Sequence, residues 1–329
     1  MSVITYKNTD VKLHNGESVL DGLLRSGFDV PCGCKAGKCQ TCLISVQRTS
    51  DPLQPAQKGV CETQKSLGYV LSCQFKPQSD TQIQTVQENG KRINAKVIEK
   101  SFLNDQVIRL RLKVSFDYKA GQYITLYKDE QTARSYSIAS HNVYHDFIEI
   151  HIRIMRKGIV SQWIKNDVWV GHEIGVQGPM GDCCYKRQVD APLIMCATGT
   201  GIAPIYGILQ DAIINGHKNE IHIVYASKRY KDFYLIEQLQ LLSKKYPHIH
   251  LHLVTQLSAG VGACKEDVYE FLSKKFKNLD GWQGYICGVD TYIKKIKKVL
   301  FLNGLNLADT FTESFLSFEI NKSESRHVK

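Results

Sequence analysis

The sequence lacks the features of a membrane-bound or exported chain. The longest run without a charged residue near the middle of the chain covers 191–210, but Gly199, Thr200, Gly201 and Pro204 interrupt it. Such a run fits a strand, a loop and a helix better than a membrane span. The N-terminal segment has neither the apolar core nor the cleavage site of a signal peptide. We therefore expect a cytoplasmic protein with no membrane contact.

Nothing in the charge pattern indicates a nucleic-acid-binding protein. The net charge is +10, which would suit nucleic acid, an acidic partner or simply a solvated basic surface. Lysines crowd near the C-terminus in a helical pattern, and no arginine-rich arm or repeat accompanies them. We therefore expect no nucleic-acid partner. The 329 residues, 43% of them hydrophobic, suffice for two or three ordinary folded domains.

Cysteine, in contrast, is plentiful. The chain has 11 cysteines, an odd number that favours metal ligands and free thiols over disulfides in a cytoplasmic protein. Cys34, Cys39 and Cys42 have the spacing Cys-x4-Cys-x2-Cys, which is typical of a plant-type 2Fe-2S cluster with a distant fourth cysteine. The small residues Ala36 and Gly37 let the loop backbone approach the sulfur atoms. The spacing therefore predicts three ligands from one loop.

The fourth ligand must come from another segment. Cys73 follows a short apolar strand and is the best candidate, whereas Cys61 lies in a polar stretch and Cys32 precedes the loop. Zinc is the alternative metal, but a second close cysteine pair is lacking. Residues 1 to about 88 resemble the plant-type 2Fe-2S ferredoxins, and the resemblance implies a β-grasp fold.

Short alternating segments in the middle of the chain predict a small antiparallel β-barrel. They cover residues 94–99, 107–114, 123–127 and 147–154. Arg134, Tyr136 and Ser137 lie among them. Arg134 suits a pyrophosphate through bidentate pairing, Tyr136 could stack on an isoalloxazine ring, and Ser137 could donate to the flavin N5 region. The alternative is a strand with an exposed arginine and a core tyrosine.

A second phosphate site is predicted where a helix begins after Gly158. Its exposed N–H groups suit a pyrophosphate, and Ser161 could add a hydroxyl bond; the alternative is an ordinary capped helix. Residues 91–188 resemble the flavin domain of the ferredoxin–NADP reductase superfamily. We include Ile152 and Val160 among the expected cofactor-binding residues. The residues alone leave FAD or FMN open.

The last third alternates strands and helices, which predicts a doubly wound α/β domain with a parallel sheet. Gly199, Thr200, Gly201 and Pro204 form a Gly-x-Gly-x-x-Pro loop that opens a helix after the first strand, where a dinucleotide pyrophosphate would rest. The loop is similar to that of the same reductase superfamily. The resemblance implies a nicotinamide nucleotide here, with Cys287 near the nicotinamide; the alternative for Cys287 is a buried thiol at a strand end.

Two further features of this part concern the cofactors. Positive residues after the second strand would suit NADPH, but Arg229 followed by Asp232 is more similar to the NADH-preferring members, so we expect NADH, with NADPH possible. The resemblance also implies a terminal aromatic ring that covers the flavin. Phe311 fits this place, with Phe315 as a rival.

The three resemblances together predict a multidomain α+β and α/β protein. The expected parts are a 2Fe-2S ferredoxin domain at 1–90, an FAD-binding β-barrel at 91–188, an NAD(P)H-binding domain at 189–315 and a disordered tail at 316–329. Their order is that of FAD-containing reductases of ring-hydroxylating dioxygenases and related monooxygenases. The resemblance implies an enzyme, an electron-transfer reductase component that passes electrons from NADH through FAD and the cluster to a ferredoxin or terminal oxygenase.

Two alternatives to this function stay open, and the oligomeric state is expected to be monomeric. The first is a reductase partner of a deoxysugar dehydrase, which has a similar layout. The second, from another class, is an iron–sulfur redox sensor without catalysis. A sensor would need no flavin site, and Arg134, Tyr136 and Ser137 speak against it.

Overall fold

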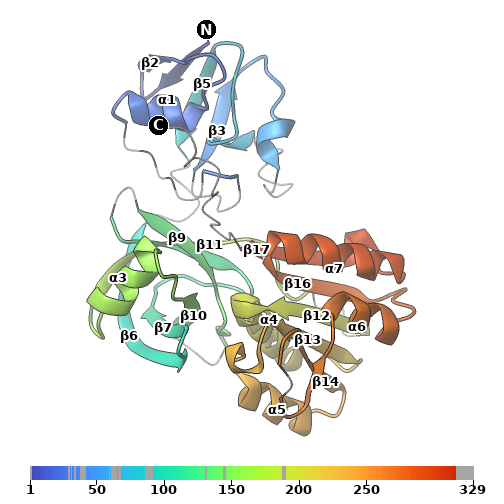
Figure 1. The fold of residues 1–329 in the computed structure, drawn as a ribbon. Coiled ribbons are helices and arrows are strands. Elements are labelled where there is room, and N and C mark those ends of the chain that lie inside the picture. The colour runs from blue at the N-terminus through green and yellow to red at the C-terminus, as the bar shows by residue number, and fades with distance from the viewer. Residues whose placement is uncertain are drawn as a thin grey trace, which may run out of the picture.

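The computed structural model describes residues 2–28, 30, 32, 35–37, 42–58, 60, 65, 68–85, 92–129, 132–143, 146–186, 190–258 and 260–315. Three units follow one another along the chain (Figure 1). The expected boundaries near 90 and 188 and the expected tail at 316–329 lie outside the described residues, so they stay predictions.

The first unit is a five-stranded mixed sheet with one helix, as a β-grasp fold requires. Its strands have the order β2-β1-β5-β3-β4, and β1 and β5 are parallel. The helix α1 begins after Ser18, whose side chain accepts a hydrogen bond from the Asp21 N–H. The elements are β1 (Val3–Tyr6), β2 (Thr9–Lys12), α1 (Val19–Arg25), β3 (Leu43–Arg48), β4 (Tyr69–Leu71) and β5 (Thr81–Thr85).

The second unit is a six-stranded antiparallel sheet in the order β10-β7-β6-β11-β8-β9. The sheet curls, and an isolated antiparallel bridge between Ile138 and Ile150 brings its two edge strands together. This curled sheet encloses an apolar core that helix α3 covers at one end. The elements are β6 (Ile93–Asn104), β7 (Val107–Lys113), β8 (Tyr123–Tyr127), β9 (Ala133–Ser137), β10 (Phe147–Arg153), α3 (Ile159–Asp167) and β11 (Glu173–Met180).

The third unit is a parallel sheet with helices on both faces, as predicted. The strand order is β15-β14-β13-β12-β16-β17, with all pairs parallel. Its elements are β12 (Leu193–Thr198), α4 (Ile202–Ile214), β13 (Ile221–Ser227), α5 (Ile236–Lys245), β14 (Ile249–Thr255), β15 (Ala263–Lys265), α6 (Val268–Lys275), β16 (Gln283–Val289), α7 (Asp290–Leu302) and β17 (Thr310–Phe315).

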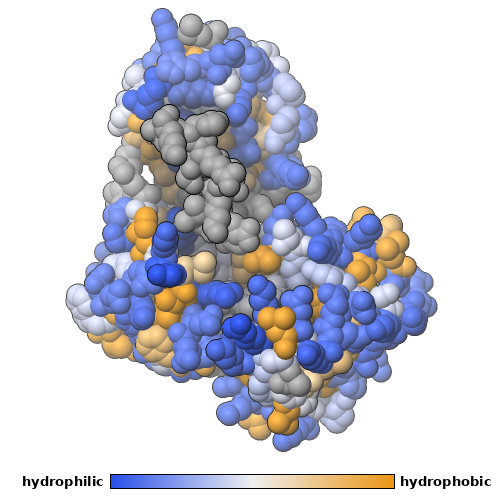
Figure 2. Space-filling view, viewed as in Figure 1, coloured by the Kyte–Doolittle hydropathy of each residue, from blue (hydrophilic) through white to orange (hydrophobic). Residues whose placement is uncertain are grey.

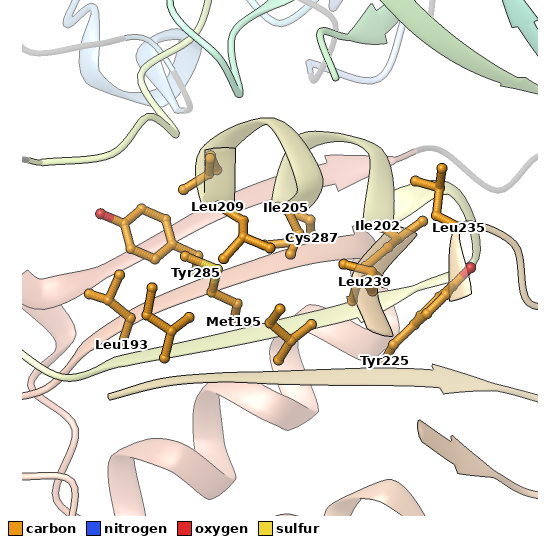
Figure 3. Packing of buried hydrophobic residues seen from close by; sticks show 14 of the residues in the cluster. Leu193, Met195, Ile202, Ile205, Leu209, Tyr225, Leu235, Leu239, Tyr285 and Cys287 are labelled. Carbon is orange, nitrogen blue, oxygen red and sulfur yellow. The ribbon is translucent and has the colours of Figure 1, made fainter. Parts of the chain in front are cut away.

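Two cores cover the faces of this sheet. Helices α4 and α5 pack on one face, and α6 and α7 pack on the other. Figure 3 shows the first core, where Ile202, Ile205 and Leu209 of α4 lie over Tyr285 and Cys287 of β16. Because all strands run the same way, the sheet has one edge where strands begin and one where they end. We call these the N-terminal edge and the C-terminal edge.

The surface in view is mostly hydrophilic, with hydrophobic side chains in small scattered groups (Figure 2). No helix in the described part of the chain combines the length and the apolar character that a bilayer crossing requires.

Candidate cofactor and electron-transfer site

Two of the four expected cluster ligands lie side by side in the ferredoxin-like unit. The N–H and the hydroxyl of Ser72 both donate to the Cys42 carbonyl oxygen, at 3.0 and 2.8 Å. This pair of hydrogen bonds between the two segments brings Cys73 next to Cys42, and both side chains are buried. Cys34 and Cys39 lie outside the described residues, as does the competitor Cys61.

The segment after Cys73 also contacts the cysteine loop. The Gln74 side-chain amide lies 3.5 Å from both the Lys35 carbonyl oxygen and the Cys73 sulfur. Gly37 has a φ of +72°, and an ideal Cβ there would lie 2.8 Å from the Gln74 side chain. The loop therefore needs a glycine at this position to reach Cys73. Buried thiols and an approaching N–H donor form a donor set that fits a 2Fe-2S cluster.

The predicted flavin residues lie on β9. Arg134 and Tyr136 share one side of the strand and are half-buried, whereas Ser137 is buried at the strand end. The Ser137 hydroxyl has no hydrogen-bond partner among the described residues. A buried hydroxyl without a partner costs about 1–3 kcal/mol. This orphaned hydroxyl therefore fits a cofactor that supplies the missing hydrogen bond.

The second predicted phosphate site is the first turn of helix α3. Helix α3 begins after Gly158, and no side chain in the described part caps its first turn, so its N–H groups suit an anion. The Ser161 hydroxyl, however, accepts from the Met155 N–H at 3.1 Å and lies 3.2 Å from the Gly158 carbonyl oxygen. It fixes the turn that precedes the helix. Both hydrogen bonds of this hydroxyl are to backbone atoms of the same segment.

Ile152 and Val160 have buried side chains in the core of the curled sheet. Neither side chain faces the surface, so only their backbone atoms are placed to contact a cofactor.

The glycine loop of the nucleotide unit packs tightly against β16. Gly199 has a φ of +54°, and its carbonyl oxygen accepts from the Tyr225 hydroxyl at 3.3 Å. An ideal Cβ at Gly201 would lie 2.1 Å from the Cys287 carbonyl oxygen, a distance that no side chain tolerates. Pro204 lies in the first turn of α4, where its missing N–H costs no hydrogen bond. Within the described residues no side chain caps this helix, which leaves room for a pyrophosphate at its N-terminus beside Thr200.

The flavin unit and the nucleotide unit meet along α4. The Gln210 side-chain amide donates to the Ala139 carbonyl oxygen at 3.3 Å, and His141 Nε2 lies 3.1 Å from Asp211 Oδ1. An ideal Cβ at Gly207 would lie 3.1 Å from the Ile138 carbonyl oxygen. Thus the helix that follows the glycine loop packs on the residues that directly follow Ser137.

Three polar groups gather near the C-terminal edge. The Cys183 thiol, in the loop after β11, is hydrogen-bonded to Cys287, and this contact together with burial raises the pKa of Cys183 well above its usual value. Glu313 of β17 is the register partner of Cys287. Burial and the nearby Asp182 raise the pKa of Glu313 to about 8. The raised pKa favours the protonated form of the Glu313 carboxyl group.

The two phenylalanines of β17 lie at different points along the strand. Phe311 pairs with Tyr285, with ring centroids 5.2 Å apart, and the Lys186 ammonium lies 4.7 Å from its ring. The rival Phe315 pairs with Val289 at the last residue of β16. Since parallel strands end at the C-terminal edge, it is Phe315 that lies at the edge that carries the glycine loop.

Comparison with known proteins accounts for most of the chain. Residues 4–78 match the 2Fe-2S iron–sulfur cluster binding domain, 94–185 the oxidoreductase FAD-binding domain and 195–298 the oxidoreductase NAD-binding domain. A Ralstonia sp. reductase component of naphthalene 1,2-dioxygenase/salicylate 5-hydroxylase systems is 25% identical, with 92% of this chain and 94% of the relative covered. The chain belongs to the FAD- and 2Fe-2S-containing reductases.

Other relatives of this reductase have the same layout. Reductase component 1 of a Comamonas sp. terephthalate 1,2-dioxygenase is 28% identical, over 90% of this chain and 91% of the relative. The crystal structure of an Amycolatopsis cytochrome P450 reductase shares the fold, with a TM-score of 0.69, 21% identity and coverage of 96% and 99%. The reductase is an NAD(P)H-dependent oxidoreductase, and its cofactors are a 2Fe-2S cluster, FAD and NAD(H).

Sequence reasoning missed Cys183 and Glu313 of the reductase. Cys183 lies in a loop without a recognisable motif, and Glu313 reaches Cys287 only through the register of β17 with β16. The one available signal was the alternation of Phe311, Glu313 and Phe315, which places all three on one face of a strand.

Proposed function

We propose that this reductase passes electrons from NADH through FAD and the 2Fe-2S cluster to a ferredoxin or a terminal oxygenase. One observation carries the proposal: three features meet where α4 packs on the flavin unit. They are the orphaned Ser137 hydroxyl, the glycine loop and the end of β16 at Cys287. The names of the relatives, which are components of oxygenase systems, support the acceptor class. A cytoplasmic location and a monomeric state are part of the proposal.

The bound FAD would take two electrons from the nicotinamide and release them singly to the cluster. Arg134 is proposed to pair with the FAD pyrophosphate, and the first-turn N–H groups of α3 to assist it. Tyr136 supplies a ring face, and Ser137 supplies the hydrogen bond that is missing in its buried position. Fixed donors of this kind orient a ring without reorganisation during the reaction.

On the nucleotide side, Gly199, Thr200 and Gly201 are proposed to hold the pyrophosphate of NADH by their backbone. Cys287 borders the nicotinamide, and the protonated Glu313 beside it keeps this buried edge neutral. Phe315, rather than Phe311, is proposed as the ring that covers the flavin.

For the metal centre we propose Cys34, Cys39, Cys42 and Cys73 as ligands. The Ser72 bonds to the Cys42 carbonyl oxygen support the pairing of Cys42 with Cys73. The buried Cys42 and Cys73 side chains would shield their side of the cluster from solvent.

The activity is tested with the purified, fully loaded protein under anaerobic conditions. NADH should bleach the flavin absorbance first and the cluster absorbance next, and cytochrome c should be reduced as a one-electron acceptor. A flavin that NADH leaves oxidised, or a preparation that contains no flavin, would overturn the proposal.

The ligand set is tested by single cysteine substitutions. Cys73→Ser should abolish the cluster signal and cytochrome c reduction while NADH still bleaches the flavin. Cys32→Ser is the matched control, since Cys32 is also buried in this unit but is not a proposed ligand. Loss of the cluster in Cys61→Ser, with retention in Cys73→Ser, would contradict the assignment.

A further inference from the structure

A group of histidines lies at the N-terminal edge of the nucleotide-unit sheet, away from the glycine loop. His222 of β13 and His250 of β14 are register partners, so their side chains lie side by side on the face that α6 and α7 cover. Glu220 precedes β13. The ligand atoms that Glu220, His222 and His250 offer all lie within 4.8 Å of one another.

We propose that Glu220, His222 and His250 bind a divalent transition-metal ion, with Zn²⁺ as the representative ion. Two imidazoles and one carboxylate form a ligand set that suits zinc, and a three-ligand site keeps a position open for water. With bonds of about 2.0–2.1 Å, ligand atoms of a tetrahedral site are about 3.3–3.4 Å apart. His222 Nε2 and Glu220 Oε2 are already 3.3 Å apart, so this pair needs no rearrangement.

His252 is the positioning residue of this site. Its Nε2 lies 3.0 Å from His222 Nδ1, and the two rings are stacked, with an interplanar angle of 14°. When His222 donates from Nδ1 to His252, its Nε2 presents a lone pair on the side of Glu220. Metal-binding histidines usually have such a partner on the second ring nitrogen, and the partner fixes both tautomer and ring orientation.

Two aromatic side chains pack against the His222 ring. The ring centroids of Phe276 and Trp282 lie 5.1 and 5.6 Å from that of His222, and the imidazole of His222 is half-buried between them. Glu220 is exposed and can close over an ion from the solvent side. Lys275, at the end of α6, interacts electrostatically with His222 and His252 and opposes a cation, which predicts moderate rather than very tight affinity.

Metal binding is measured on the untagged protein, because a polyhistidine tag would bind Zn²⁺ itself. The cluster and FAD are kept in place, so that the cluster cysteines are occupied. Equilibrium dialysis against Zn²⁺, with the metal quantified by mass spectrometry, should give one zinc per chain beyond background. His222→Ala and His250→Ala should each weaken binding at least about tenfold, and Glu220→Gln by a smaller factor.

Two controls separate this site from other zinc-binding groups. His14→Ala removes an exposed histidine of the ferredoxin-like unit and should leave binding unchanged. Cys264→Ser removes the exposed thiol beside Glu266 and should also leave it unchanged. In all five variants NADH should still bleach the flavin at the wild-type rate, which shows that the fold is intact and that the proposed activity is tested separately.

His252→Ala keeps the three ligands but should weaken zinc binding about 10- to 100-fold, and His252→Gln, whose amide oxygen can still accept the hydrogen bond, should restore part of it. Unchanged binding in both His222→Ala and His250→Ala means an adventitious ion only and overturns the proposal. So does binding that depends on Cys264, or a wild-type protein that takes up no zinc.

Discussion

The two edges of the nucleotide-unit sheet are built for binding in opposite ways. At the C-terminal edge the groups near the expected nucleotide belong to the backbone, and Gly201 lies so close to Cys287 that a single added carbon has no space. At the N-terminal edge the candidate ligands are side chains, from Glu220 and two neighbouring strands. The site at the C-terminal edge therefore requires residues without a side chain, whereas the site at the N-terminal edge requires particular side chains as ligands.

The largest effect should follow from adding one carbon at the C-terminal edge. In Gly201→Ala the new Cβ would lie 2.1 Å from the Cys287 carbonyl oxygen, so the loop must move away from β16. Displacement of a bound substrate by about 1 Å costs on the order of 100-fold in rate. We therefore expect the rate of flavin reduction by NADH, measured by stopped flow, to fall by about 100-fold with flavin content retained.

Gly216→Ala is the control for this prediction. Gly216 has a positive φ of +74°, whereas Gly201 has a φ of −60°, and nothing lies within 4 Å of the ideal Cβ of Gly216. A rate loss of equal size in Gly216→Ala would show that a general loss of stability in this unit, and not the contact with β16, lowers the rate.

The next largest effect should distinguish the two phenylalanines of β17. Phe315→Ala should lower the rate of flavin reduction about tenfold and leave the melting temperature nearly unchanged, because its ring lies at the C-terminal edge. Phe311→Ala should do the reverse, since its ring packs on Tyr285 and an aromatic pair contributes about 0.5–1.5 kcal/mol. Stopped flow and thermal melts of both variants measure the two quantities, and equal rates in both would remove Phe315 from the site.

A smaller effect concerns the protonation of the C-terminal edge. The pKa of Glu313 is raised to about 8 from an ordinary value of 4.5, so the folded state binds a proton that the unfolded state releases. Its contribution to stability is fully present below about pH 4.5 and is lost as the pH rises through about 8. We expect a loss of about 2 kcal/mol over this window, after discounting for partial exposure.

Glu313→Gln cannot ionise and should lack this loss. The melting temperatures of the wild type and the variant, compared from pH 5 to pH 9, should therefore diverge in favour of the variant as the pH rises. Parallel curves would show that Glu313 is ionised in the folded protein at neutral pH.

The smallest effect is expected from the N-terminal edge. His222→Ala should change the rate of flavin reduction by NADH less than about twofold, because His222 lies near the start of β13 and the rest of this strand lies between it and the C-terminal edge. A large loss in the same stopped-flow assay would mean that the two edges are coupled through the sheet.

The features that the sequence predicted depend on residues close together in the chain, and those that it did not predict depend on contacts between distant segments. The cysteine spacing, the glycine loop and the three-unit order could be predicted, because each depends on residues close together in the chain. Cys183 beside Cys287 and the pairing of Glu313 with Cys287 could not, since they arise from strand register and from a loop between units. The hydrogen bond from the Met155 N–H to the Ser161 hydroxyl could not be predicted either, because it depends on how the turn before α3 folds.

The alternation along β17 has a consequence for how this part of the chain could change length. Phe311, Glu313 and Phe315 face the same way, and each pairs with a residue two positions further along β16. An inserted or deleted single residue would turn all three to the opposite face, whereas a shift of two would exchange their neighbours and keep the face. Length variation in this strand is therefore permitted only in steps of two, and a chain shortened by two residues before Phe315 would move this ring to the position of Glu313, opposite Cys287, and away from the end of the sheet.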